Sequence, residues 1–173
     1  MKNFLLTAFF CLLLALSSCK KQNTDPAPGT LIATVNGADV NLSTSAVARM
    51  FYDADLKEYG LNVVGSTGTV AGSGSIVAEM LAFSPFANGT YTCCNVATST
   101  QIVNASIIYV PASNSNTEPF FAGDGSESFP ITVTITSISN TNLQGTFTGT
   151  SVSTSPAANT TISGKFNVAI EHD

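Results

Sequence analysis

The sequences ITVTIT (131–136), LQGTF (143–147) and ISGKF (162–166) carry the clearest structural pattern in this chain. In the first, aliphatic residues alternate with threonines, so a strand places the aliphatics on one face and the hydroxyls on the other. The other two repeat an aliphatic residue, a glycine and a phenylalanine at alternate positions, 19 residues apart. All three then share one side of each strand, where a bare glycine leaves room for a ring from the neighbouring strand. Val168 and Ile170 extend the buried face of the last strand.

Turn signals separate further short runs with strand character. Residues 30–42 predict a hairpin with its turn at Asn36 and Gly37, because this pair readily adopts positive φ angles. Residues 46–53 fit both helical and strand spacing, and the β-rich context favours a strand that forms a second hairpin with 61–64. We expect further strands at 76–83, 90–96 and 102–110.

The regular spacing of these strands predicts an all-β fold. An antiparallel β-sandwich is expected, with a lipocalin-like or other small β-barrel as the alternative. Residues 65–75 hold four glycines and five Ser or Thr, which predicts a flexible loop. This loop lacks the lysine that a phosphate-binding loop requires. Length predicts a single domain over residues 30–173.

The polar surface of this chain rests on hydroxyl and amide groups more than on charge. Ser, Thr and Asn supply 56 of the 173 residues, whereas charged residues supply 10%. Six Lys and Arg against eleven Asp and Glu give a net charge of −5 without a basic stripe. Since binding to nucleic acid needs clustered cations, a nucleic-acid partner is not expected.

The N-terminus is typical of a signal peptide over residues 1–18. Lys2 precedes an apolar run of 13 residues, which suits a signal and is shorter than the roughly 20 residues of a membrane-spanning helix. The following LSSC (16–19) resembles the bacterial lipobox. That resemblance implies cleavage between Ser18 and Cys19 and acylation of Cys19, with palmitate as an expected chain. The alternative is an ordinary secretory signal with an incidental cysteine.

Residues 19–29 are expected to be the lipidated Cys19 and a flexible tether. The segment KKQNTDPAPG (20–29) has two prolines and no aliphatic side chain larger than alanine. Several acyl chains would hold the protein stably on a membrane, because each buried methylene contributes about 0.8 kcal/mol. We expect a cell-envelope protein, anchored to the outer membrane with the domain on its periplasmic or cell-surface side.

Several short motifs together look like the small uncharacterised lipoproteins of Bacteroidota type. The resemblance rests on Cys19 with Lys20 and Lys21, ATVNG (33–37), GTY (89–91), ITVTI (131–135), GTF (145–147) and ISGKFN (162–167). Members commonly have an aromatic residue shortly after the first Asn-Gly, where this chain has Val40. The resemblance implies fold and location, and it transfers no catalytic residue.

The residue types and their spacing give little support for a catalytic site or a zinc site. The one histidine, His172, is second from the end, where we expect a solvated tail in place of a general base. The mature chain has no Gly-x-Ser-x-Gly elbow and no Ser-x-x-Lys pair. Zinc needs about four ligands at suitable spacing, which one histidine and adjacent cysteines cannot supply. No catalytic residue, metal or cofactor is assigned.

Two acidic clusters remain as weaker candidates. Asp53, Asp55 and Glu58 lie in an expected turn, where solvated charge is favoured over a Ca²⁺ site. With Asp124 and Glu127 they could supply the paired carboxylates of a small envelope hydrolase, for example a glycosidase pair of Asp55 and Glu127.

Cys93 and Cys94 are adjacent, so a disulfide between them would be strained, and two unpaired thiols are favoured. The leading functional hypothesis is a lipid-anchored module that binds an unidentified ligand or protein through its loops, or acts as a scaffold. A structural or adhesive surface protein is a further alternative.

Overall fold

The computed structural model describes residues 25–93, 102–113, 120–123, 131–151 and 160–172. These residues form strands and no helix, which confirms the all-β prediction. The strands are β1 (Thr30–Val35), β2 (Ala38–Asn41), β3 (Val47–Asp53), β4 (Glu58–Ser66), β5 (Ser75–Ala82), β6 (Gly89–Cys93), β7 (Ile102–Val110), β8 (Phe120–Ala122), β9 (Ile131–Ile138), β10 (Asn142–Ser151) and β11 (Thr160–His172).

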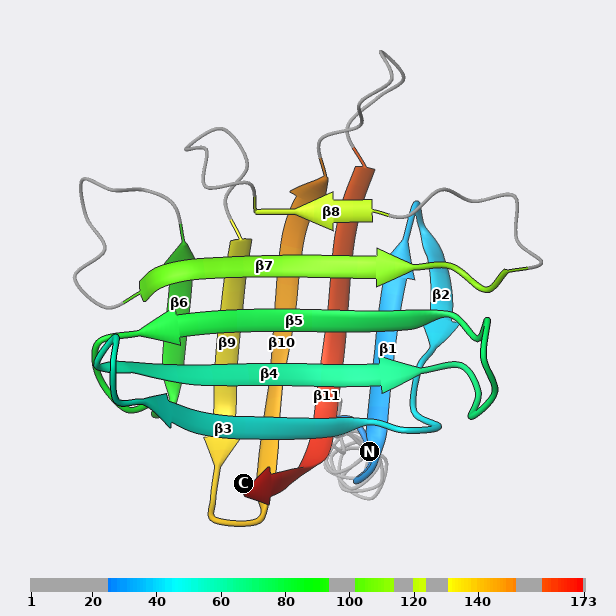
Figure 1. The fold of residues 1–173 in the computed structure, drawn as a ribbon. Coiled ribbons are helices and arrows are strands. Elements are labelled where there is room, and N and C mark those ends of the chain that lie inside the picture. The colour runs from blue at the N-terminus through cyan, green and yellow to red at the C-terminus, as the bar shows by residue number, and fades with distance from the viewer. Residues whose placement is uncertain (1–24, 94–101, 114–119, 124–130, 152–159, 173) are drawn as a thin grey trace, which may run out of the picture.

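The strands lie in two layers that pack face to face, a sandwich-like arrangement (Figure 1). The back layer has the order β2-β1-β11-β10-β9-β6, and the front layer has the order β3-β4-β5-β7-β8. Strands of the front layer run across those of the back layer (Figure 1). The core fills the space between the layers, and its largest fully buried side chains include Phe166, Leu31, Leu61, Met80, Ile107 and Ile135.

The two layers meet at two corners of the fold. At one corner β11 extends beyond the back layer, and its last residues, 169–172, pair with β3. At the other corner β8 pairs with β7 and, through Ala122 and Ser151, with β10. The β11–β3 pairing is parallel, so the sheet is mixed, whereas the other pairings between the described strands are antiparallel as predicted. Among the described strands the sheet ends at β2 and β6, so it is open and the barrel alternative is not adopted.

The two glycine–phenylalanine repeats pair directly with each other in the back layer. In the β10–β11 register, Gly145 lies opposite Phe166 and Phe147 lies opposite Gly164. Each ring covers the facing glycine: a Cβ on Gly164 would lie 2.2 Å from Phe147 Cζ, and a Cβ on Gly145 would lie 2.7 Å from Phe166 Cζ. The two rings stack at 6.5 Å between centroids. The predicted packing of rings over bare backbone is therefore confirmed.

The same packing recurs in the β3–β4 hairpin. Gly60 lies opposite Phe51, and a Cβ on Gly60 would lie 2.0 Å from Phe51 Cζ. Residues 46–53, ambiguous in sequence, thus form a strand whose phenylalanine covers a glycine of its hairpin partner. The first hairpin also turns where predicted, since Asn36 and Gly37 have φ angles of 52° and 78°.

Two segments differ from expectation. The sequence 65–75 was expected to be a flexible loop, but Gly65 and Ser66 belong to β4 and Ser75 to β5. The remaining loop is held by hydrogen bonds, among them Thr67 N to Gly74 O at 2.8 Å. The short strand β8 was not expected, because three residues carry too little periodicity to be recognised.

Candidate functional site

The described chain begins with a segment that is tied to the back layer. Asn167 of β11, which is buried, donates from Nδ2 to the carbonyl oxygen of Pro26 at 2.8 Å. Its Oδ1 accepts a hydrogen bond from Asn142 Nδ2 of β10, also at 2.8 Å. The expected tether over 19–29 is therefore fixed to the domain at Pro26. Cys19, Ser18 and the rest of the predicted signal peptide lie outside the described residues.

The outer face of the back layer is rich in hydroxyl groups. Cross-strand register places Thr90 of β6 beside Thr134 of β9, and Thr92 beside Thr132. The hydroxyl oxygens of these two pairs lie 3.1 Å and 3.3 Å apart. We call this surface the hydroxyl face, and it consists of Thr34, Thr90, Thr92, Thr132, Thr134, Thr146, Thr148 and Ser163. It is the strand face that the alternation in 131–136 assigned to threonines.

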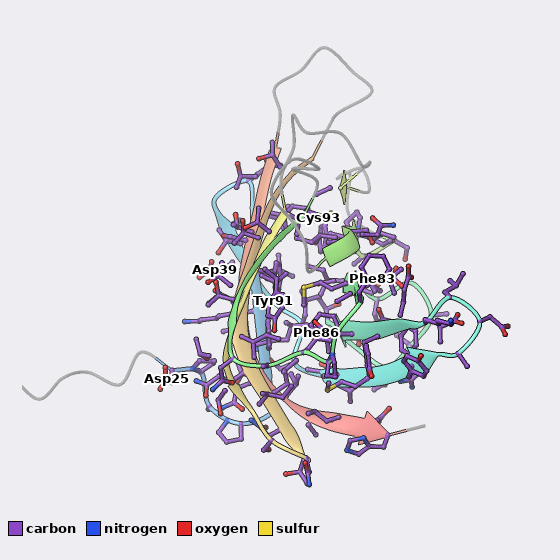
Figure 2. All side chains as sticks on the ribbon, turned by 90° about the vertical axis from the view of Figure 1, so that its left-hand side faces the viewer. Asp25, Asp39, Phe83, Phe86, Tyr91 and Cys93 are labelled. Atoms are coloured by element: carbon purple, nitrogen blue, oxygen red, sulfur yellow. The ribbon has the colours of Figure 1, made fainter. Side chains whose placement is uncertain are left out.

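A depression of about 400 Å³ lies on the hydroxyl face, over β1, β2, β10 and β11. Its polar lining includes one side chain of each charge, and the full lining is Ile32, Thr34, Asp39, Thr146, Phe147, Ser163, Gly164 and Lys165. Thr34 Oγ1 donates to Asp39 Oδ1 at 2.6 Å. The Lys165 ammonium is exposed and has no ion pair among the described residues. Figure 2 shows Asp39 on the outer side of this layer, away from Phe86 and Tyr91, which lie between the layers.

The first acidic cluster, Asp53, Asp55 and Glu58, lies in and beside the β3–β4 turn. Asp53 Oδ1 accepts hydrogen bonds from the backbone N–H groups of Asp55 at 2.9 Å and Leu56 at 3.0 Å. Lys57 adopts a φ of 58°, and Glu58 then pairs with Asp53 to start β4. One oxygen of Asp53 is thus occupied in forming the turn. Asp124 and Glu127 lie outside the described residues, so the hypothesis of paired carboxylates has no geometry here.

His172 is exposed, as expected, but it belongs to strand β11 and not to a tail. His172 pairs with Met50 in the β11–β3 register. Its Nε2 lies 2.6 Å from the carbonyl oxygen of Asn140, in the turn between β9 and β10. Because a carbonyl only accepts, Nε2 carries the proton in this contact. Beside it, Glu171 Oε2 accepts from Arg49 Nε at 3.1 Å.

Cys93 is buried at the end of β6 and takes part in a disulfide. The prediction of an unpaired thiol is therefore wrong for Cys93. Cys94, the second residue of the predicted pair, lies outside the described residues.

Sequence reasoning did not find the depression, although a signal was present. Lys165 stands between Gly164 and Phe166, so period two places it on the face opposite the core. In the first hairpin, the same alternation predicts that the Asp39 side chain lies on the face opposite the core. What the sequence could not show is that β1 pairs with β11, which brings Thr34 beside Ser163 and so joins the two ends of the chain.

No family model, curated protein or solved structure matches this chain. Within the described ranges, no three His, Cys, Asp or Glu side chains gather as metal ligands would. The same part of the chain has no helix with the length and apolarity to cross a membrane.

Proposed function

We propose that this protein is a lipid-anchored binding module of the cell envelope, with the hydroxyl face of the back layer as its binding surface. Acylated Cys19 would hold it to the outer membrane. The observation that carries the proposal is the depression around Lys165 and Asp39. It offers an unpaired cation, a carboxylate and several hydroxyls on one rigid sheet.

The tie at Pro26 sets how far the domain stands from its anchor. Cys19 and Pro26 are seven residues apart, and an extended chain of that length spans about 23–25 Å. The attachment to Asn167 holds the first described residues close to the back layer. Asn167 lies on the same outer face of β11 as Lys165, so anchoring at this point would hold the domain near the membrane from the hydroxyl face.

The chemistry of the depression favours a ligand with hydroxyl groups and an anionic group. Lys165 would pair with the anion, because its ammonium carries three donors and no described partner. Asp39 would accept from a ligand hydroxyl, and Thr146 and Ser163 can both donate and accept. A carboxylated polysaccharide combines these groups, and on this face hydrogen bonding would recognise it without aromatic stacking.

Calorimetric titration of the full chain with polygalacturonate, and with neutral dextran for comparison, tests this function. We expect binding of polygalacturonate that weakens with salt and falls at least tenfold in Lys165→Gln. The matched control is Lys57→Gln, which removes the same charge from the β3–β4 turn. Binding that is equal in both variants, or no preference for the carboxylated polymer, would refute the assignment of this face.

The hydrolase alternative is not proposed, because the one described acidic cluster builds a turn. A structural or adhesive role would use the same hydroxyl face. Such a role predicts attachment to surfaces that Lys165→Gln leaves unchanged.

A further inference from the structure

The outer face of the front layer carries an aliphatic row across four strands. In register, Val47 of β3 lies beside Val64 of β4, then Val77 of β5, then Ile108 of β7. The residues that follow these four in the sequence point into the core, so the four side chains themselves point away from it. Each is only half-buried. A continuous apolar row on an outer face marks a surface that gains free energy when it is covered.

A polar row runs parallel to the aliphatic row, two residues along each strand. It consists of Arg49, Asn62, Glu79 and Ser106 on the same four strands. Arg49 and Glu79 lie on either side of Asn62, each one strand away, at about 4.8 Å per strand. Opposite charges thus stand at equal distances from a central amide.

We propose that two copies of this chain associate front layer on front layer, about a two-fold axis that runs along β4 over Asn62. Rotation about this axis exchanges the β3 side of the polar row with its β5 side. It brings Arg49 of each copy opposite Glu79 of the other, and it faces the aliphatic row with its own counterpart. The surface is therefore self-complementary in charge and in apolarity, as a two-fold interface requires.

The charge pattern also excludes the other face-to-face arrangement. A two-fold axis that runs along the polar row, across the strands, would place Arg49 over Arg49 and Glu79 over Glu79. Juxtaposed like charges are unfavourable at an interface that excludes water. Only the axis along β4 pairs the opposite charges. Packed sheets stand about 10 Å apart, which suits the medium-sized side chains of both rows.

One further observation fits this interface. A depression of about 460 Å³ lies on this face at the edge of the aliphatic row, with Ser45, Val47, Arg49, Val64 and Glu171 around it. In the two-fold arrangement, Val77 and Glu79 of the second copy lie over this hollow.

Arg49 can serve both its own chain and the second copy. Its Nε donates to Glu171 of the same chain, where both side chains are half exposed. The guanidinium has five N–H donors, so the terminal nitrogens remain for Glu79 of the second copy. Because the interface is small, we expect a dissociation constant in the micromolar range.

Sedimentation equilibrium of the full chain, in a detergent matched to the solvent density, tests this proposal. We expect a reversible dimer in the wild-type chain. Arg49→Glu and Glu79→Arg each place like charges at two symmetric positions, and each should weaken dimerisation more than tenfold. The double variant restores opposite charges and should recover most of the wild-type affinity.

Lys57→Glu is the matched control, because it reverses an exposed charge in the β3–β4 turn away from both rows. It should leave the dimer unchanged. Circular dichroism of each variant confirms that the strands have formed. A monomeric wild-type chain overturns the proposal, and so does a double variant that dimerises no better than the single variants.

Discussion

The substitution Gly164→Ala tests the packing of rings over glycines that joins β10 to β11. A methyl group at this position would lie 2.2 Å from Phe147 Cζ and 2.8 Å from the carbonyl oxygen of Ile32. Phe147 is only 3% exposed, so its ring is surrounded by other side chains on most sides. We therefore expect the substitution to force the two strands apart or to displace the ring.

The expected cost follows from two opposing effects. Overpacking a filled core costs about 1–3 kcal/mol. Replacing glycine by alanine restricts the unfolded chain, which returns about 0.4–1 kcal/mol. Gly164→Ala should therefore lower the free energy of unfolding by about 1–2 kcal/mol. Gly145→Ala should cost more, because its methyl group would lie 2.2 Å from the backbone oxygen of Thr134, which a side-chain rotation cannot relieve.

Urea unfolding of the full chain, followed by circular dichroism, measures these costs, and a double-mutant cycle isolates the contact. Phe147→Ala alone should cost about 3–5 kcal/mol. With the ring removed, Gly164→Ala should cost only about 0–1 kcal/mol, since the nearest remaining atom is then the oxygen of Ile32 at 2.8 Å. The coupling between the two positions is then about 1 kcal/mol.

Gly68→Ala is the control, because its only close neighbour is the Ser73 side chain, whose hydroxyl can rotate away. It should change stability by less than about 0.5 kcal/mol. The reasoning is refuted if Gly164→Ala behaves like Gly68→Ala, or if its cost is the same with and without the Phe147 ring.

Three further predictions concern the turn, a buried phenol and the N-terminal tie. Asp53→Ala removes two hydrogen bonds to the β3–β4 turn and should lower the free energy of unfolding in urea by about 0.5–2 kcal/mol. Asp55→Ala, the control, should lower it little. Added Ca²⁺ should not change the melting temperature of the wild-type chain. Burial raises the pKa of Tyr109 above 10.0, so the folded state holds this proton more tightly than the unfolded state. That stabilisation is complete below pH 10.0 and is lost as pH rises through the folded pKa; Tyr109→Phe should flatten the alkaline fall in unfolding free energy. Asn167→Ala removes the bond to Pro26, and limited proteolysis should then cut residues 25–29 faster, while Asn41→Ala on the β2 edge should not have this effect.

Much of the fold could be predicted because its determinants are local in sequence. Alternation fixed the faces of β9, the Asn36-Gly37 pair fixed the first turn, and the glycine–phenylalanine repeats identified the central strands. The parallel pairing of β11 with β3 could not be predicted in this way. It depends on the last four residues of β11 leaving one layer for the other, and no local pattern records that crossing.

The candidate site was harder to predict than the fold for the same reason. Lys165 and Thr34 lie on outward positions that alternation does assign, but their proximity depends on pairing between the first and last strands. The sequence offered the acidic clusters only as weaker candidates, and it predicted that the terminal histidine lies in a solvated tail. The structure assigns Asp53 to a turn and His172 to a strand end, so these residues have structural roles.

Mass spectrometry of the N-terminal peptide from the membrane fraction tests the central claim, that this chain is a lipid-anchored envelope module. We predict a mature chain that begins at Cys19 and carries acyl chains on that residue. A soluble chain with unmodified Cys19, or a mature chain that begins at another residue, would contradict the account.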